Sequence, residues 1–132
     1  MKKERYFGSF SNYEDFIESF DLEDDDKAPK DRDVLFACYS TEAYEGHAFV
    51  LFKDGKKLYE VNASHYSCNG LDDGWHPEET SWEALEMRVK IVMHGRRRDE
   101  IKIDIYGIEP DAAPILAIII KENCMNRKKD AV

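Results

Sequence analysis

Apolar residues near the start of the chain recur with the spacing of an amphipathic helix. Four of them stand at i, i+3, i+4 and i+7, so that a helix would carry all of them on one face. These positions are Tyr13, Phe16, Ile17 and Phe20. Ser11 and Glu14 have the spacing of a capping box. The pattern predicts a short helix after Ser11, with its carboxylates on the outer face.

A strand and a hairpin follow. Residues 33–40 are short and rich in β-forming side chains, which predicts a largely buried strand. Two strand-like runs then flank Asp54-Gly55 in residues 47–63, and this dipeptide favours a two-residue hairpin turn. The cross-strand pairs predicted from that turn are Lys53 with Lys56, Leu51 with Leu58, Phe49 with Glu60 and His47 with Asn62.

The C-terminal part predicts a helix, a strand and a second helix. Residues 79–95 read as a helix ending at Gly95, and residues 100–108 alternate like a half-buried strand. Residues 109–126 favour a helix, although Ile118 to Ile120 would also suit a strand. We expect fraying after Cys124. The sum is an α+β fold, with an antiparallel sheet of three to five strands and two or three packed helices.

The chain has the length of one domain. It has 132 residues, of which 42% are apolar and 36% charged, so one adequate core is expected. We divide it into an acidic helix and loop at 11–33, a central hairpin and His/Cys loop at 34–78, a helix-strand-helix region at 79–126 and a tail at 127–132.

The compartment is inferred from what the sequence contains. No apolar run approaches the roughly 20 residues that span a bilayer, and the first residues lack the apolar core of a secretory signal. Three cysteines at wide spacing favour reduced thiols or metal ligands over a disulfide framework. We therefore expect a cytoplasmic protein with no membrane contact.

Acidic residues are concentrated in one stretch, residues 14–26, here called the acidic segment. It holds eight carboxylates in thirteen positions, in a chain of net charge −9. Such a charge disfavours direct binding to nucleic acid and suits a basic protein partner, while solubility alone is the plainer explanation. The predicted partner-binding residues are Glu14, Asp15, Glu18, Asp21, Glu23, Asp24, Asp25 and Asp26, with Asp72 and Asp73 from a later loop.

Histidine and cysteine side chains gather in residues 59–80. His65 and Cys68 are three residues apart in a turn-rich stretch, a spacing that can place imidazole and thiolate on one zinc ion. The remaining ligands could come from His47, Cys38 or His76. The sequence therefore predicts a structural zinc site around His65 and Cys68, without fixing its complete shell.

Two other interpretations of this stretch stay open. Cys68 could be a small buried residue, with His65 and His47 as ordinary hydrogen-bonding groups. Alternatively, Cys68 with either histidine, oriented by Asp72 or Asn62, could form a nucleophilic pair, although no recognised nucleophile signature is present. His94 at a helix end and Cys124 on an apolar helix face are expected to be structural. We predict no catalytic residue.

The central third of the chain resembles a family of small proteins of phages and mobile elements. Members share an Ala-Phe-Val-Leu hairpin, a Leu-Tyr-Glu-Val strand, a Ser-His-Cys-Ser-Cys motif, a Trp, a Pro-Glu-Glu-Thr run and a Glu-Ala-Leu helix. The matching residues here are Ala48 to Leu51, Leu58 to Val61, Ser64, His65, Ser67, Cys68, Trp75, Pro77 to Thr80 and Glu83 to Leu85. Tyr66 departs from the pattern, because it stands where the family has its first cysteine.

The resemblance implies a function in the host cell. Acidic phage-borne proteins of this size include inhibitors of host defence, among them anti-CRISPR proteins that dock on basic nucleic-acid channels. We therefore expect a non-enzymatic, zinc-binding inhibitor of a CRISPR nuclease such as Cas9. A zinc-dependent or Cys-His hydrolase, or a non-inhibitory structural or regulatory phage protein, is the alternative.

Overall fold

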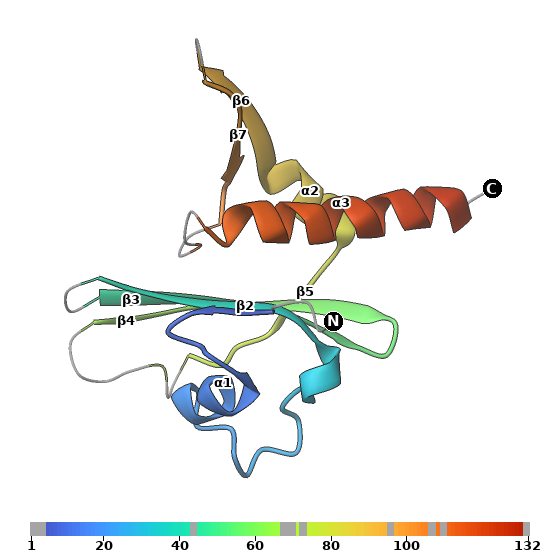
Figure 1. Cartoon of the computed structure of the whole chain (residues 1–132). Coiled ribbons are helices and arrows are strands. Elements are labelled where there is room, and N and C mark those ends of the chain that lie inside the picture. The colour runs from blue at the N-terminus through green and yellow to red at the C-terminus, as the bar shows by residue number, and fades with distance from the viewer. Residues whose placement is uncertain are drawn as a thin grey trace.

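A five-stranded sheet forms the centre of the protein in the computed structural model, which describes residues 5–42, 45–66, 71, 74–94, 97–105, 108 and 111–130. The strands lie in the order β1-β2-β3-β4-β5, and β6 and β7 form a separate two-stranded sheet. Helix α1 covers one face of the five-stranded sheet, and α2 and α3 cover the other (Figure 1). This confirms the predicted α+β fold, although β1 pairs with β2 in parallel.

The helices and strands of the described residues have the following bounds. The helices are α1 (Tyr13–Ser19), η1 (Asp31–Asp33, a 3₁₀ turn), α2 (Trp82–Arg88) and α3 (Ala113–Asp130). The strands are β1 (Tyr6–Gly8), β2 (Val34–Glu42), β3 (Glu45–Asp54), β4 (Lys57–Tyr66), β5 (Glu78–Thr80), β6 (Val89–His94) and β7 (Arg97–Ile103). No helix in the described part of the chain combines the length and apolar character needed to cross a bilayer.

Helix α1 begins one residue later than the sequence predicts. The N-cap is Asn12, whose side-chain oxygen accepts a hydrogen bond from the Asp15 backbone N–H at 2.9 Å. In return, Asp15 Oδ2 accepts from the Ser11 backbone N–H at 3.0 Å. Asn12 therefore caps the helix through the Asp15 N–H, while Asp15 binds the backbone of Ser11, and the predicted capping box of Ser11 with Glu14 was wrong by one position.

The register of the β3–β4 hairpin differs from the prediction by two residues. Asp54 pairs with Lys57, so that Gly55, with a φ of +63°, and Lys56 lie between the paired residues. His47 consequently lies opposite Ser64 instead of Asn62. Because side chains alternate with a period of two, a shift of two residues leaves each side chain on its predicted face.

Two hydrophobic cores lie on the two faces of the five-stranded sheet. The α1-side core contains the buried residues Phe10, Phe16, Phe20, Leu22, Val34, Ala37, Ala48, Val50, Phe52, Val61 and Leu71. The α3-side core contains Phe36, Cys38, Phe49, Leu51, Leu58, Leu85, Ile105, Ala112, Leu116, Ile120 and Cys124. Alternate residues of β2, β3 and β4 enter different cores, because neighbouring side chains of a strand point to opposite faces.

The largest error of the sequence-based prediction concerns residues 79–95. The predicted helix ends at Arg88, and residues 89–94 form β6, paired with β7. The β-branched residues Val89, Ile91 and Val92 suit a strand better than a helix interior. His94 accordingly ends a strand and not a helix. At the other end of the chain, α3 continues to Asp130, beyond the predicted fraying at Cys124.

Candidate functional site

The candidate metal ligands are divided between the two faces of the five-stranded sheet. His65 pairs with Gly46 on β3, and both belong to the face that carries Ala48 and the α1-side core. His47 pairs with Ser64 and alternates with Gly46, which places it on the α3 side. Cys38 is buried in the α3-side core. In this structure His65 therefore does not share one tetrahedral zinc shell with His47 or with Cys38.

His65 is held by a neighbouring tyrosine of β2. Its Nδ1 lies 2.6 Å from the Tyr39 hydroxyl, and the two rings meet edge to face with centroids 5.6 Å apart. Burial raises the pKa of Tyr39, so its phenol stays protonated at neutral pH. Gly46 makes room for this pair, since a Cβ built there would clash with the imidazole of His65. This arrangement positions the imidazole, whose Nε2 lies 3.5 Å from the same hydroxyl.

The remaining predicted ligands stand apart or outside the described residues. His76 is exposed, whereas its neighbour Trp75 stacks on Phe52 with ring centroids 5.5 Å apart. Cys68, Asp72 and Asp73 lie outside the described residues, so pairing of His65 with Cys68 stays a prediction. Among the residues that the structure does describe, no group of three His, Cys, Asp or Glu side chains is arranged to hold a metal ion.

Asn62 does not orient a catalytic histidine. Its Nδ2 donates a hydrogen bond of 2.8 Å to Glu60 Oε1 on the α3 side of the sheet, away from His65. The alternative of a Cys-His pair in which Asn62 orients His65 therefore finds no support in this geometry. Asp72, the other residue considered for orienting a histidine, lies outside the described residues.

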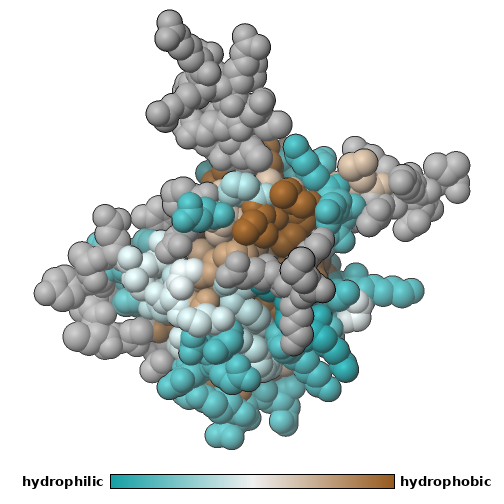
Figure 2. All heavy atoms as spheres, viewed as in Figure 1, coloured by the Kyte–Doolittle hydropathy of each residue, from teal (hydrophilic) through white to brown (hydrophobic). Residues whose placement is uncertain are grey.

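The acidic segment is anchored on the α1-side core. Phe16, Phe20 and Leu22 alternate with its carboxylates and are almost fully buried, at 0%, 1% and 4% exposure. The exposed carboxylates of this segment are Glu14, Glu18, Asp21, Glu23, Asp24, Asp25 and Asp26, and Asp15 is half-buried. Figure 2 shows the hydrophilic surface that covers this part of the molecule. The exposed carboxylates of the acidic segment thus lie over apolar residues that are packed in the α1-side core.

Backbone and side-chain hydrogen bonds fix the loop that continues the acidic segment. The Asp25 backbone N–H donates to Leu22 O at 3.1 Å, and Asp25 Oδ1 accepts from the Lys27 backbone N–H at 2.8 Å. The Tyr13 hydroxyl donates to Pro29 O at 2.7 Å, which ties the far end of the loop to α1. Asp21 has a φ of +56°, the left-handed conformation that Asp tolerates better than most residues. Together with Lys27, the four aspartates of this stretch line one surface concavity.

A buried ion pair that the sequence did not reveal joins α2 to the sheet. Glu60 is 4% exposed, and its Oε1 accepts from Arg88 Nη1 at 2.8 Å as well as from Asn62. Burial by itself would raise the pKa of Glu60, but hydrogen bonds from Arg88, Asn62 and Thr80 hold the pKa below its ordinary value. Its Oε2 is buried without a well-formed hydrogen bond in the described structure. The carboxylate is thus ionised at neutral pH and depends on Arg88.

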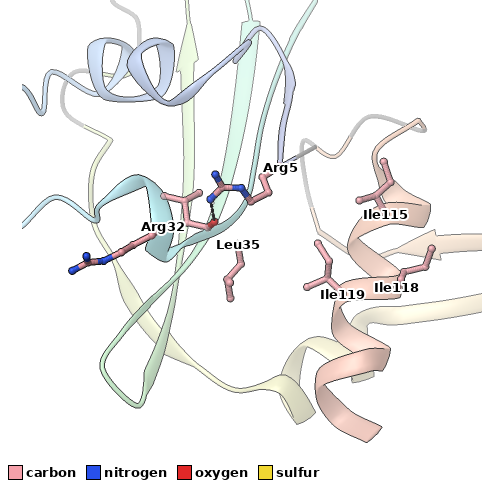
Figure 3. Close-up of a pocket in the computed structure, with 7 residues that line it drawn as sticks. Arg5, Arg32, Leu35, Ile115, Ile118 and Ile119 are labelled. Atoms are coloured by element: carbon pink, nitrogen blue, oxygen red, sulfur yellow. Dashed lines mark hydrogen bonds between the residues drawn. The ribbon is translucent and has the colours of Figure 1, made fainter. Parts of the chain in front are cut away.

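An apolar cavity of about 640 Å³ lies between the start of β2 and α3 (Figure 3). Its lining consists of Arg5, Arg32, Val34, Leu35, Ile115, Ile118 and Ile119. Arg5 is already engaged, because Nη1 donates to Val34 O at 2.8 Å and Nη2 pairs with Asp31 Oδ1 at 2.9 Å. The described lining is thus formed by aliphatic side chains and two arginines.

Comparisons of the chain with protein-family models, with curated proteins and with solved structures found no match. The resemblance to phage and mobile-element proteins therefore stays a prediction that depends on the residues quoted for it. Function has to be argued from the surfaces of this molecule, because fold alone does not determine it.

Proposed function

We propose that the protein binds a basic partner protein through the acidic segment and blocks the site that it covers. The observation that supports this proposal is the anchoring of the segment. Its apolar residues are packed in the α1-side core, while seven of its eight carboxylates are exposed. A surface needed only for solubility does not require that its backbone be held in place by buried residues of the same segment.

Electrostatics favour such an interface in two ways. A dense array of like charges destabilises the fold by self-repulsion, and a complementary groove relieves that repulsion on binding. A surface that is already ordered also loses less conformational entropy on binding than a mobile loop would. Complementary charge chiefly raises the association rate and the specificity, and both effects weaken with salt over a Debye length of about 8 to 10 Å.

The resemblance to phage proteins guides the choice of partner. A nucleic-acid channel of a CRISPR nuclease is lined with Lys and Arg, and the acidic segment would compete there with nucleic-acid phosphates. The target to test first is therefore a guide-loaded Cas9-type nuclease. The activity of the protein would then be steric, with no catalytic step of its own.

The direct test is inhibition of DNA cleavage by the purified nuclease, with increasing amounts of this protein. The informative variant carries Glu18→Lys, Asp24→Lys and Asp26→Lys, three exposed positions in the acidic segment. We expect the wild-type protein to inhibit and the variant to lose at least about 100-fold in inhibitory concentration, since three reversed charges oppose the same groove.

A matched variant controls for the change in net charge. Glu45→Lys, Glu86→Lys and Asp104→Lys also replace three exposed carboxylates, but none of them belongs to the acidic segment. We expect this control to inhibit within about threefold of wild type, because surface charges remote from an interface contribute little. Equal loss in both variants, or no inhibition by wild-type protein of any basic-channel nuclease tested, would refute the proposal.

A further inference from the structure

The strand side of the apolar cavity is shaped by a β-bulge at the start of β2. The pairing of β2 with β3 skips Leu35, because Val34 and Phe36 have adjacent partners on β3. Val34 therefore belongs to the α1-side core and Phe36 to the α3-side core, although residues two apart in a regular strand share a face. A bulge re-aims a side chain, and Figure 3 shows Leu35 across the cavity from Ile119 of α3.

The helix side of the cavity is a row of isoleucines that the core does not require. Leu116 and Ile120 belong to the face of α3 that is buried in the α3-side core. Ile115, Ile118 and Ile119 lie at i, i+3 and i+4, so they form a second apolar row beside that face, along the cavity. Ile118 is 52% exposed, and its β-branched side chain is also unfavourable at an exposed helix position. Neither core packing nor helix propensity therefore explains it, and Figure 2 shows the hydrophobic surface that results over α3.

Two arginines supply positive charge at this apolar cavity, and its described lining contains no carboxylate. Arg5 Nη1 donates to the backbone oxygens of Asp31 and Val34, and its Nη2 donates to Asp31 Oδ1. Its Nε–H and one Nη2–H are thereby left without a partner among the described residues. Arg32 is exposed and forms no ion pair with any described residue.

Carboxylates of the adjoining segments lie outside the described lining. They are Asp31 and Asp33 of η1 and Glu122, one turn further along α3. Asp31 neutralises part of the Arg5 charge, since its Oδ1 accepts from Arg5 Nη2 at 2.9 Å and from the Tyr6 hydroxyl at 2.7 Å. Arg32 and the unused donors of Arg5 therefore remain for an anion, beside aliphatic walls.

From these observations we propose that the cavity binds a free alkyl carboxylate of the fatty-acid type. A planar carboxylate matches the paired N–H donors of a guanidinium, and the alkyl chain covers Leu35, Ile118 and Ile119. Figure 3 shows Arg32 extending away from α3, so Arg32 turns toward the carboxylate on binding, which its exposed position allows. The volume of about 640 Å³ lies within the range of about 300 to 1,000 Å³ that is usual for small-molecule sites. This inference does not rest on the proposed role of the acidic segment.

The test is an NMR titration of the isotope-labelled full chain with decanoate, followed through the backbone amides of β2 and α3. We expect shifts around Leu35 and Ile118 and a Kd on the order of 100 μM. Octanoate should bind roughly tenfold more weakly, since each of the missing buried methylenes accounts for about a fourfold change. Decanol, with the same chain and no charge, should bind at least about threefold more weakly than decanoate.

Variants separate the two parts of the site. Ile118→Ser and Ile119→Ser should each weaken the binding of decanoate and decanol at least about fivefold, because both ligands lose the same apolar contact. Arg32→Gln should weaken decanoate binding at least about threefold and leave decanol within about twofold, since it removes only the charge. Two exposed residues of α3 outside the described lining supply matched controls, Met125→Ser for the apolar change and Lys121→Gln for the charge. Each control should change both Kd values less than about twofold.

Thermal unfolding checks that each variant is folded, and Ile118→Ser, at an exposed position, keeps the test valid if Ile119→Ser is destabilised. The proposal is overturned if wild-type protein does not bind decanoate, if decanol binds as tightly as decanoate, or if the control variants weaken binding as much as the cavity variants. Binding to anionic phospholipid vesicles that depends on Ile118, without binding of decanoate, would also overturn it and indicate a membrane surface.

Discussion

Glu60 of β4 and Arg88 of α2 form an ion pair at 2.8 Å, in which the carboxylate is almost fully buried and the guanidinium side chain is about one-third exposed. Arg88 is the last residue of α2 and directly precedes β6. The pair therefore joins the end of α2, where the β6–β7 hairpin begins, to β4, the strand that also carries His65.

Removing the arginine should cost substantial stability. Arg88→Met leaves the Glu60 carboxylate buried without its cationic partner, and we expect a loss of about 3 kcal/mol in the free energy of unfolding. Urea denaturation followed by circular dichroism measures this loss. The control is Lys57→Met, which breaks the exposed ion pair of Lys57 with Glu79 at 3.6 Å and should cost less than about 0.5 kcal/mol. Similar losses in the two variants would contradict the structural role of Glu60.

The same carboxylate predicts a pH dependence. The pKa of Glu60 is lower in the folded protein than its ordinary value of 4.5, so the folded state favours the ionised form. The resulting stabilisation is fully present above pH 4.5 and is lost as the pH falls through the lower, folded-state pKa. Chemical denaturation of wild type and Glu60→Gln at a series of pH values should show a stability difference that shrinks below pH 4.5. A difference that grows on acidification would reverse the sign of this prediction.

Gly46 should tolerate no side chain while His65 keeps its position. In Gly46→Ala the new Cβ would clash with His65 Cε1 and stand 2.8 Å from Tyr39 Cε1. Both rings would have to move, and we expect a destabilisation of about 2 kcal/mol. The double variant Gly46→Ala with His65→Ala removes part of the clash and should be less destabilised than the two separate losses added together. Strict additivity would show that the two positions do not touch.

The division of the candidate ligands between two faces makes the zinc prediction sharper. If zinc is bound by Nε2 of His65 together with Cys68, then His65→Ala and Cys68→Ser should both abolish the metal measured per chain by mass spectrometry. Cys38→Ser and His47→Ala should retain it, because these residues belong to the α3 side of the sheet. Loss of metal in the Cys38 or His47 variant would contradict this assignment.

The sequence predicted those elements whose local signals agree with their tertiary environment. The spacing of Phe16 and Phe20 predicted α1, and the residues around Gly55 predicted the β3–β4 hairpin. The turn itself was placed one position too early, because Asp54-Gly55 and Gly55-Lys56 are both credible turn centres and only the pairing decides between them. Strands β1 and β5 have three residues each, which is too short for a periodic pattern to be recognised.

The site was less predictable because it depends on which face each side chain occupies. His47 pairs with Ser64, the residue next to His65. Because neighbouring residues of a strand point to opposite faces of the sheet, the two histidines lie on opposite faces. The Glu60–Arg88 pair joins residues 28 positions apart, and no local motif marks it. Exposure of the acidic segment was predictable from its charge, but its anchoring through Leu22 and the bond from Tyr13 to Pro29 required the structure.

The most direct test of the proposed interface is amide hydrogen exchange of the protein alone and in complex with the guide-loaded nuclease. Docking through the acidic segment predicts slower exchange on binding in residues 14–26, with little change in the β3–β4 turn. Protection of the β3–β4 turn or of α3, with unchanged exchange in the acidic segment, would show that another surface makes the contact and would refute docking through the acidic segment.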